Sequence, residues 1–276
     1  MLVACIIIMD KKRFEKIISD IRAIKIQGAR NIAKSALEAY YLFPSKSSKK
    51  KLLSLRPTEP MMENVLNMAE KGVSKKEILN HFLETQEKIN QSVFKLIKNN
   101  EIIFTHCHST NVVNSLIYAK KHGKTFQVYN TETRPLFQGR KTALELKKAG
   151  IKVTMFVDSA LGVALSKEQG TKKPNKVFLG ADALLKNGVI NKIGSGMIAE
   201  IAHNHKIPLY IVADSWKFTK KPVPIEQRKL NEVWDKAPKN IKIKNPAFEF
   251  VPKKYLSGIV TEYGSMRYNQ FLKKIK

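Results

Sequence analysis

The chain has 276 residues, of which 43% are hydrophobic and 26% are charged. These values are ordinary for a globular protein of one large domain or two modest ones, and they argue against a mainly disordered chain, a collagen-like chain or a membrane bundle. Fifty Lys and Arg against 23 Asp and Glu give a formal charge of +27, which excludes a neutral or acidic surface and favours anionic partners such as nucleic acid, acidic lipid or phosphorylated metabolites.

Residues 1–9 form an apolar stretch that lacks the basic flank and the cleavage site of a secretory signal and is too short to span a bilayer. It is either a dispensable extension, with translation starting at Met9, or a short leading strand or arm, and we favour the extension. The two cysteines, Cys5 and Cys107, cannot build a disulfide framework. We therefore expect a soluble protein in the reducing cytoplasm.

The first 98 residues are predicted to form an all-helical N-terminal domain, because apolar side chains recur at helical spacing. Gly28 interrupts the first periodic stretch, and a capping-box pattern at Ser74 and Glu77 marks a later helix start. The predicted elements are two helices within 12–41 joined at Gln27–Gly28, a polar basic loop over 44–51, a helix after the turn at 56–58, and a helix from 74 to about 98.

From residue 99 to 276, short apolar runs alternate with amphipathic stretches. This alternation predicts repeated β-α-β units and hence an α/β domain built on a doubly wound parallel sheet. The predicted strands are 102–105, 125–129, 152–157, 176–179 and 208–212; the predicted helices are 110–121, 140–149, 161–166 and 195–205. Further short strands and turns are expected in the proline-rich tail after residue 220.

In such sheets, ligands bind beyond the carboxyl ends of the strands. The loops there are rich in polar and reactive groups: 105–109, 132–135, 158–159, 180–182 and 213–217. None carries the glycine pattern of a dinucleotide site or of a Walker-type nucleotide site, so no nucleotide cofactor is favoured.

Cys107 ends the first predicted strand and precedes a helix N-terminus, a position that lowers a thiol pKa and favours the reactive thiolate. The alternative is an inert core cysteine, which is the commoner fate of this residue and the one favoured by Cys107 taken alone. His106 and His108 flank it and could present two metal ligands to one face. No convincing third ligand accompanies them, so we expect packing or hydrogen bonding and no metal.

Asp182 follows an apolar strand, where a raised carboxyl pKa would let it hold or shuttle a proton; a turn cap or helix cap is an equally good interpretation. Asn191 and Lys192 follow the Asn187–Gly188 turn and could bind phosphate together with the next helix start. A capped helix start with one surface lysine is the alternative. Three further basic residues stand at predicted turns or strand ends, where such residues are ordinarily solvated: Arg56, Arg134 and Lys217.

Several of these segments occur together in one family. They are Ile24–Ala29, Arg56–Thr58, Thr105–Ser109, Thr131–Pro135 with Gln138–Gly139, Gly180–Asp182, Asn191–Gly194, Asp214–Phe218, Lys239–Phe248 and Val260–Glu262. With these segments, the chain resembles the family of translation initiation factor 2B regulatory subunits and their enzymatic relatives, methylthioribose-1-phosphate isomerase and archaeal ribose-1,5-bisphosphate isomerase. The Thr-His-Cys-His-Ser and Glu-Thr-Arg-Pro segments are most similar to the last of these.

The resemblance implies a Rossmann-like C-terminal domain and conversion of ribose 1,5-bisphosphate to ribulose 1,5-bisphosphate without metal or cofactor. Catalysis is implied at Cys107, for the carbon-bound proton, and at Asp182, for the sugar oxygen, with the roles open to exchange. The implied positions for phosphate and sugar are Gln27, Gly28, Ala29, Arg56, Gln138, Asn191, Lys192 and Lys217. A homo-oligomer built on a dimer is also implied.

Gln27 stands where the family's isomerases have arginine, and a neutral amide there would cost a few kcal/mol of phosphate binding. Arg30 would compensate if it faced the site and not solvent. The alternative function is a non-catalytic regulatory subunit that binds initiation factor 2, although regulatory subunits generally lack one or both of Cys107 and Asp182. We expect no specific nucleic-acid site and no membrane partner, because the basic residues are scattered pairs without interleaved aromatic residues.

Overall fold

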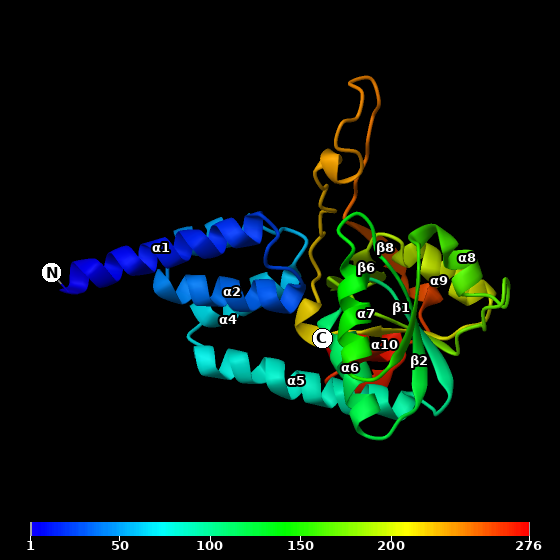
Figure 1. The fold of residues 1–276 in the computed structure, drawn as a ribbon. Coiled ribbons are helices and arrows are strands. Elements are labelled where there is room, and N and C mark those ends of the chain that lie inside the picture. Colours follow the sequence, from blue (N-terminus) through cyan, green and yellow to red (C-terminus); the bar gives the residue numbers. More distant parts are fainter. Residues whose placement is uncertain (1, 276) are drawn as a thin grey trace.

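The computed structural model describes residues 2–275 and shows a group of helices packed against a sheet that has helices on both faces (Figure 1). The helical part comprises α1 (Leu2–Arg22), α2 (Ala29–Leu42), α3 (Lys46–Leu53), α4 (Pro60–Glu70) and α5 (Lys75–Leu96). In this described range, no helix is both long and apolar enough to cross a membrane.

Most helix predictions for the N-terminal part are confirmed. The chain breaks between α1 and α2, where Gly28 has a φ of 82°, and the capping box of Ser74 and Glu77 begins α5. One expectation is wrong. Residues 46–53 form α3 where a loop was predicted, because Ser45 caps the helix and Leu52 anchors it in the core. Residues 2–9 belong to α1, so the alternative of a short leading strand does not apply.

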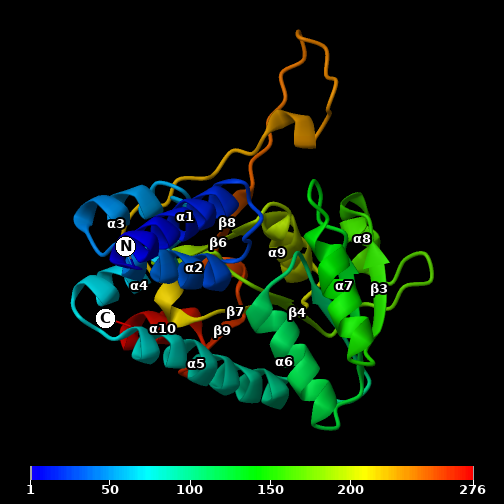
Figure 2. The ribbon, with the colours of Figure 1, turned by 60° about the vertical axis from the view of Figure 1, so that its left-hand side comes forward.

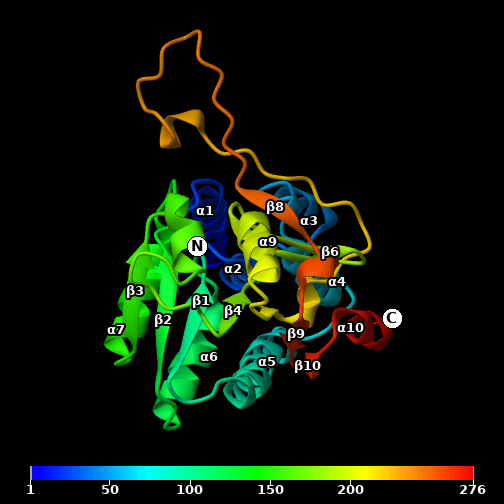
Figure 3. The same ribbon diagram turned by 90° about the vertical axis from the view of Figure 1, so that its right-hand side faces the viewer.

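The predicted parallel sheet is confirmed. Seven strands lie in the order β10-β9-β7-β4-β1-β2-β3, and in Figure 3 the labelled strands β3, β2, β1, β4 and β9 follow one another from left to right. All neighbours pair in parallel except β9 and β10. The strands are β1 (Glu101–Thr105), β2 (Phe126–Thr131), β3 (Lys152–Phe156), β4 (Lys176–Leu179), β7 (Leu209–Val212), β9 (Gly258–Thr261) and β10 (Gly264–Met266).

Helices bury both faces of this sheet, as doubly wound topology requires. One apolar cluster joins α5, α6 (Thr110–Lys121) and α7 (Gln138–Lys148) to the sheet. The cluster on the other face joins α8 (Leu161–Ala164), α9 (Ser195–Asn204) and α10 (Tyr268–Lys274) to it. The short 3-10 helices are η1 (Asp158–Ala160), η2 (Ser215–Lys217), η3 (Leu230–Glu232) and η4 (Lys253–Tyr255).

A second, antiparallel sheet of three strands has the order β5-β6-β8: β5 (Ala183–Leu185), β6 (Gly188–Lys192) and β8 (Phe248–Pro252). The predicted turn at Asn187–Gly188 joins β5 to β6. In Figure 2, β8 lies at the base of the long orange loop that precedes it. The chain between η2 and β8, residues 219–247, which we call the projecting segment, first passes Arg56 at Glu226, then extends away from the body and returns to β8 (Figure 1).

Helix α5 takes part in two apolar cores. Its first half contributes Ile78 and Phe82 to the core of the helical part, and its second half contributes Ile89 and Val93 to the core on the sheet. The division into a helical domain over 1–98 and a sheet domain over 99–276 stays a prediction, as does the dispensability of residues 1–9. The shared helix gives a direct route for coupling the two parts.

Gly139→Ala is expected to destabilise the protein by about 1–3 kcal/mol or more, because overpacking against backbone cannot relax by a rotamer change. A Cβ at this position would lie 1.8 Å from the carbonyl oxygen of Thr131. Urea denaturation of the wild type and the variant would measure the loss. Gly162→Ala is the control, since nothing lies within 4 Å of a Cβ there. Equal free energies of unfolding for both variants would contradict the expectation.

Candidate active site

One cleft collects every site residue that the sequence and the resemblance indicated. Its lining includes Gln27, Gly28, Ala29, Arg56, Cys107, Gln138, Asp182, Asn191, Lys192 and Lys217. The loops after β1, β4 and β7 meet here because these strands are parallel and neighbouring. The chain before α2 and the turn before α4 complete the wall, so the cleft lies between the helical part and the sheet.

The backbone of Cys107 is held from two sides at the end of β1. Its N–H donates to Thr133 Oγ1 (3.0 Å), and its carbonyl accepts from Thr142 Oγ1 (2.8 Å). These bonds fix a residue whose φ of 64° lies in the left-handed region, which is unfavourable for a non-glycine residue. Such strain is typical of functional sites, where the surrounding contacts hold the residue in place.

The expectation of a lowered thiol pKa at Cys107 is wrong. Burial raises the pKa of this thiol to about 11, although the nearby Lys192 opposes the shift. The helix after it starts only at Thr110, and its N-terminus is capped by Ser109, whose Oγ accepts from the Val112 N–H. Desolvation therefore has a larger effect on the thiol pKa than the helix N-terminus, and Cys107 is a neutral thiol at pH 7.

Asp182 lies between β4 and β5, and its N–H donates to the carbonyl of Ile190. Because a strand follows it, the interpretation as a helix cap does not apply. Burial raises the pKa of its carboxyl group, while the positive charges of Lys217, Lys192 and Arg56 act in the opposite direction.

Gly180 lets the loop of Asp182 approach the start of α6. A Cβ on this glycine would lie 2.6 Å from Ser109 Oγ, the side chain that caps that helix. The close approach brings the loops after β1 and β4 together. Cys107 and Asp182, which belong to those loops, therefore line the same cleft.

The two histidines beside Cys107 are hydrogen-bonded within the protein, as expected. The carbonyl of Ile193 can only accept, so His106 Nε2 donates to it (2.9 Å) and Nδ1 accepts from the Thr131 hydroxyl. Burial lowers the His106 pKa to about 4, which keeps the ring neutral. His108 Nε2 lies 3.2 Å from Glu145 Oε2.

Three buried cations line the cleft together with Cys107 and Asp182. Arg56, Lys192 and Lys217 are each 6–7% exposed, so they are not solvated surface charges. Lys217 Nζ donates to the carbonyl of Ala181, next to Asp182. Asn191 Nδ2 donates to Ser195 Oγ (2.8 Å), which ties the end of β6 to the start of α9. Buried cations with few partners are suited to an anionic ligand.

The N-terminus of α2 adds backbone donors to the cleft. Within the described residues no side chain caps this helix, whose N-cap is Gly28, so its first N–H groups are available to an anion. Gln138 Nε2 lies 3.5 Å from Gln27 Oε1. Gln138 Oε1 is buried and has no hydrogen-bond partner in the part of the chain that the structure describes.

Arg30 does not compensate for the absence of the arginine that the family resemblance led us to expect at position 27. Its guanidinium donates to the carbonyl of Phe82 and to Gln86 Oε1, both on α5. The side chain is thus committed to holding α2 against α5. Arg134 is exposed, with its guanidinium 5.0 Å from the ring centroid of Phe137, as expected of a surface charge.

Sequence reasoning missed three charged residues of the cleft, Glu59, Lys141 and Arg228. Glu59 follows the Arg-Pro-Thr motif directly, and this adjacency was the only signal for it. Arg228 belongs to the projecting segment, where its guanidinium lies 3.6 Å from Glu226 Oε1 and donates to Glu232 Oε1 (2.9 Å). No local pattern marks a residue that reaches the site through a long irregular segment.

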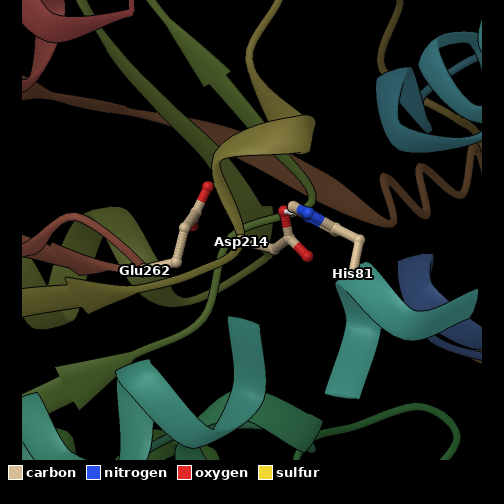
Figure 4. Close-up of side chains that lie close together, drawn as sticks. All are labelled: His81, Asp214 and Glu262. Carbon is tan, nitrogen blue, oxygen red and sulfur yellow. Dashed lines mark hydrogen bonds and ion pairs between the residues drawn. The ribbon is translucent and has the colours of Figure 1, made fainter. Parts of the chain in front are cut away.

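A separate cluster joins His81, Asp214 and Glu262, whose candidate ligand atoms lie within 4.8 Å of one another (Figure 4). Both Glu262 oxygens accept from Ser215, and Asp214 Oδ1 accepts from the Trp216 N–H (2.9 Å). The His81 ring stacks on Trp216 at 3.4 Å. Because the carboxylates already accept hydrogen bonds from the chain, the cluster serves to fix η2, and with it Lys217, between α5 and β9.

Comparison with known proteins agrees with this geometry. The model of the initiation factor 2 subunit family matches residues 25–268. The chain belongs to this family. It is 34% identical to the ribose 1,5-bisphosphate isomerase of Archaeoglobus fulgidus, over 89% of this chain and 87% of that protein. It is 31% identical to the methylthioribose-1-phosphate isomerase of Thermosipho melanesiensis, over 97% of this chain and 91% of that protein.

The fold of this family member is also found in solved structures. The crystal structure of translation initiation factor eIF-2B from Pyrococcus horikoshii is similar, with a TM-score of 0.80 and 25% identity, over 92% of this chain and 97% of that one. The all-helical N-terminal part followed by a Rossmann-like sheet is therefore the family's architecture.

Proposed function

We propose that the protein is a sugar-phosphate aldose–ketose isomerase that converts ribose 1,5-bisphosphate to ribulose 1,5-bisphosphate. The observation that carries the proposal is the single cleft in which Cys107 and Asp182 stand among the buried cations Arg56, Lys192 and Lys217. The relatives named for their reactions are sugar-phosphate isomerases, which supports the class of reaction. The choice of ribose 1,5-bisphosphate follows the first of them.

The raised pKa of Asp182 fits a division of labour in which the carboxyl group is the acid and the thiol, once ionised, is the base. Asp182, which holds its proton more tightly than an exposed carboxyl group, protonates the ring oxygen as the bond from C1 to that oxygen breaks. In the fraction of molecules in which the Cys107 thiol has lost its proton to solvent, the thiolate removes the proton from C2, and the electron pair forms an enol between C1 and C2. Asp182 then takes the proton of the 2-hydroxyl group while C1 receives the proton from Cys107. Both groups regain their starting state, and no cofactor takes part.

The test is a coupled assay of the purified protein with α-ribose 1,5-bisphosphate, with ribulose 1,5-bisphosphate detected as product. Methylthioribose 1-phosphate, offered in parallel, distinguishes between the two substrates of the relatives. Turnover of the bisphosphate with the higher kcat/KM supports the proposal. Preference for methylthioribose 1-phosphate would correct the substrate, and no turnover of either would refute the isomerase.

The second candidate is a non-catalytic regulatory subunit related to initiation factor 2B. The substitution at Gln27 and the structural likeness to an eIF-2B chain favour it. It predicts that tagged protein retains initiation factor 2 on an affinity column and turns over neither sugar phosphate. The presence of both Cys107 and Asp182 in the cleft favours the enzyme.

Gln27→Arg is expected to lower KM for ribose 1,5-bisphosphate about tenfold or more. A guanidinium at this place adds a charge-assisted hydrogen bond to phosphate, worth about 1.5–3 kcal/mol. Gln91→Arg, an exposed position on α5, is the control for one added charge. Initial-rate kinetics of the three proteins measure the effect. Equal KM values for wild type and Gln27→Arg would show that residue 27 does not contact a phosphate.

A homo-oligomer built on a dimer completes the proposal. One similar structure is a tetrameric eIF2B complex of two β and two δ subunits from C. thermophilum, 17% identical to this chain. Sedimentation equilibrium of the purified protein would measure the oligomer mass, and a monomer at assay concentration would contradict this part of the proposal.

A further inference from the structure

Glu59 is a buried carboxyl group for which the reaction just described has no use. The residue is 3% exposed, and its Oε2 atom has no hydrogen-bond partner among the described residues. It lies at the N-cap position of α4, yet its side chain makes no capping hydrogen bond. The usual reason for an acidic residue at a helix start therefore does not apply, and the side chain lines the cleft instead.

The charges around Glu59 come from four parts of the chain. Its Oε1 lies 3.6 Å from an Arg56 guanidinium nitrogen, in the same turn. Lys217 of η2 also attracts a negative charge there, whereas Asp182, after β4, and Glu226, on the projecting segment, repel it. Burial adds to the repulsion, and the Glu59 pKa is raised to about 8. The carboxyl group is therefore mostly neutral at pH 7.

Arg56 is the residue that this arrangement affects most. Its Nε donates to Glu226 Oε2 (2.9 Å), so one carboxylate already partners the guanidinium. If Glu59 were ionised as well, two carboxylates would surround one arginine, and the guanidinium would have little attraction left for a phosphate dianion. With Glu59 neutral, the guanidinium keeps attraction for a further anion, and the carboxylic acid offers an O–H donor.

We propose that Glu59 controls anion binding in the cleft through its protonation state. As a carboxylic acid it donates a hydrogen bond to a phosphate oxygen held by Arg56, and as a carboxylate it repels that phosphate. Binding of the phosphorylated substrate is thus accompanied by proton uptake at Glu59. The inference rests on the proposed function in that it takes the bound anion to be a sugar phosphate. Glu59 is a specificity-determining residue here and takes no part in breaking bonds.

The test is calorimetric titration of the purified full-length protein with inorganic phosphate at pH 7 and pH 9. With a pKa of about 8, the protonated fraction of Glu59 falls about tenfold between these values, so the wild-type Kd should rise about tenfold. Glu59→Gln keeps the shape and a hydrogen-bond donor but cannot ionise, so its Kd should not show this rise. The ionisation of phosphate itself is common to all variants and cancels in the comparison.

Two further variants control the result. Glu63→Gln makes the same change one turn along α4, at a partly exposed residue that does not line this cleft and pairs with Lys221, and should behave as wild type. Asp182→Asn should keep a rise in Kd but move it to lower pH, because Asp182 helps to raise the Glu59 pKa and is not itself the titrating group of the proposal. A rise that persists in Glu59→Gln, or one lost in Asp182→Asn alone, overturns the assignment to Glu59.

A measurement on the wild type alone covers the case in which Glu59→Gln does not fold. At pH 8, titrations in buffers of different ionisation enthalpy should show uptake of about half a proton by Glu59 per bound phosphate. Absence of proton uptake, or of phosphate binding at pH 7, overturns the inference. The isomerase assay is independent: phosphate binding with the expected pH dependence but no sugar turnover leaves Glu59 in place and refutes only the enzyme.

Discussion

Cys107→Ser is expected to lower kcat/KM for ribose 1,5-bisphosphate by about 10²–10⁴-fold, the range that a positioned acid–base group contributes. Serine is nearly isosteric with cysteine, but its hydroxyl group is far less acidic than a thiol and cannot take and return a carbon-bound proton at neutral pH. The backbone of residue 107 keeps its hydrogen bonds to the side chains of Thr133 and Thr142 in the variant, so the cleft should stay intact. Cys5→Ser, which changes the other cysteine of the chain, is the control.

The same variant tests the role given to the thiol. In heavy water, the wild type should exchange the C1 protons of ribulose 1,5-bisphosphate for deuterium, because Cys107 removes a proton from C1 in the reverse reaction. Cys107→Ser should lose this exchange, which proton NMR follows directly. Exchange at the wild-type rate in Cys107→Ser would assign the carbon-bound proton to another group.

The strands and helices of the sheet could be predicted because each carries its own signal. A buried parallel strand such as β1 is a continuous apolar run, and its partner helices are amphipathic. The loops after such strands then had to meet, and this placed Cys107, Asp182 and Lys217 near one another. The second sheet gave no comparable signal, since β8 pairs with β6 across about sixty residues of chain.

The charge balance of the cleft could not be predicted, since it depends on burial and on partners distant in sequence. Cys107 shows this most clearly: the helix that follows it suggested a lowered thiol pKa, and desolvation reverses the direction. Glu59 and Glu226 meet at Arg56 although 167 residues separate the two acids in the sequence. The +27 charge likewise did not indicate that the site would hold carboxylates.

Asp182→Asn is expected to lower kcat by about 10²–10⁴-fold, because an amide cannot supply the proton that the ring oxygen needs. KM should stay the same or fall. Asparagine is neutral, as is the protonated Asp182 that starts the reaction, so Lys217, Lys192 and Arg56 keep their attraction for the substrate's phosphates. A loss in kcat with preserved KM is the signature of a group that acts in the reaction and not in binding. Asp235→Asn, an exposed position on the projecting segment, is the control.

Two further measurements distinguish a chemical role of Asp182 from a structural one. Exchange at C1 of ribulose 1,5-bisphosphate uses Asp182 only at the 2-oxygen and not at the ring oxygen, so Asp182→Asn should keep more of the exchange than of the isomerisation, whereas Cys107→Ser loses both. Asp182 also raises the pKa of the Cys107 thiol, so the variant should shift the pH midpoint of Cys107 alkylation downward. If isomerisation and exchange fell together while the alkylation midpoint stayed in place, Asp182 would be shaping the cleft rather than moving a proton.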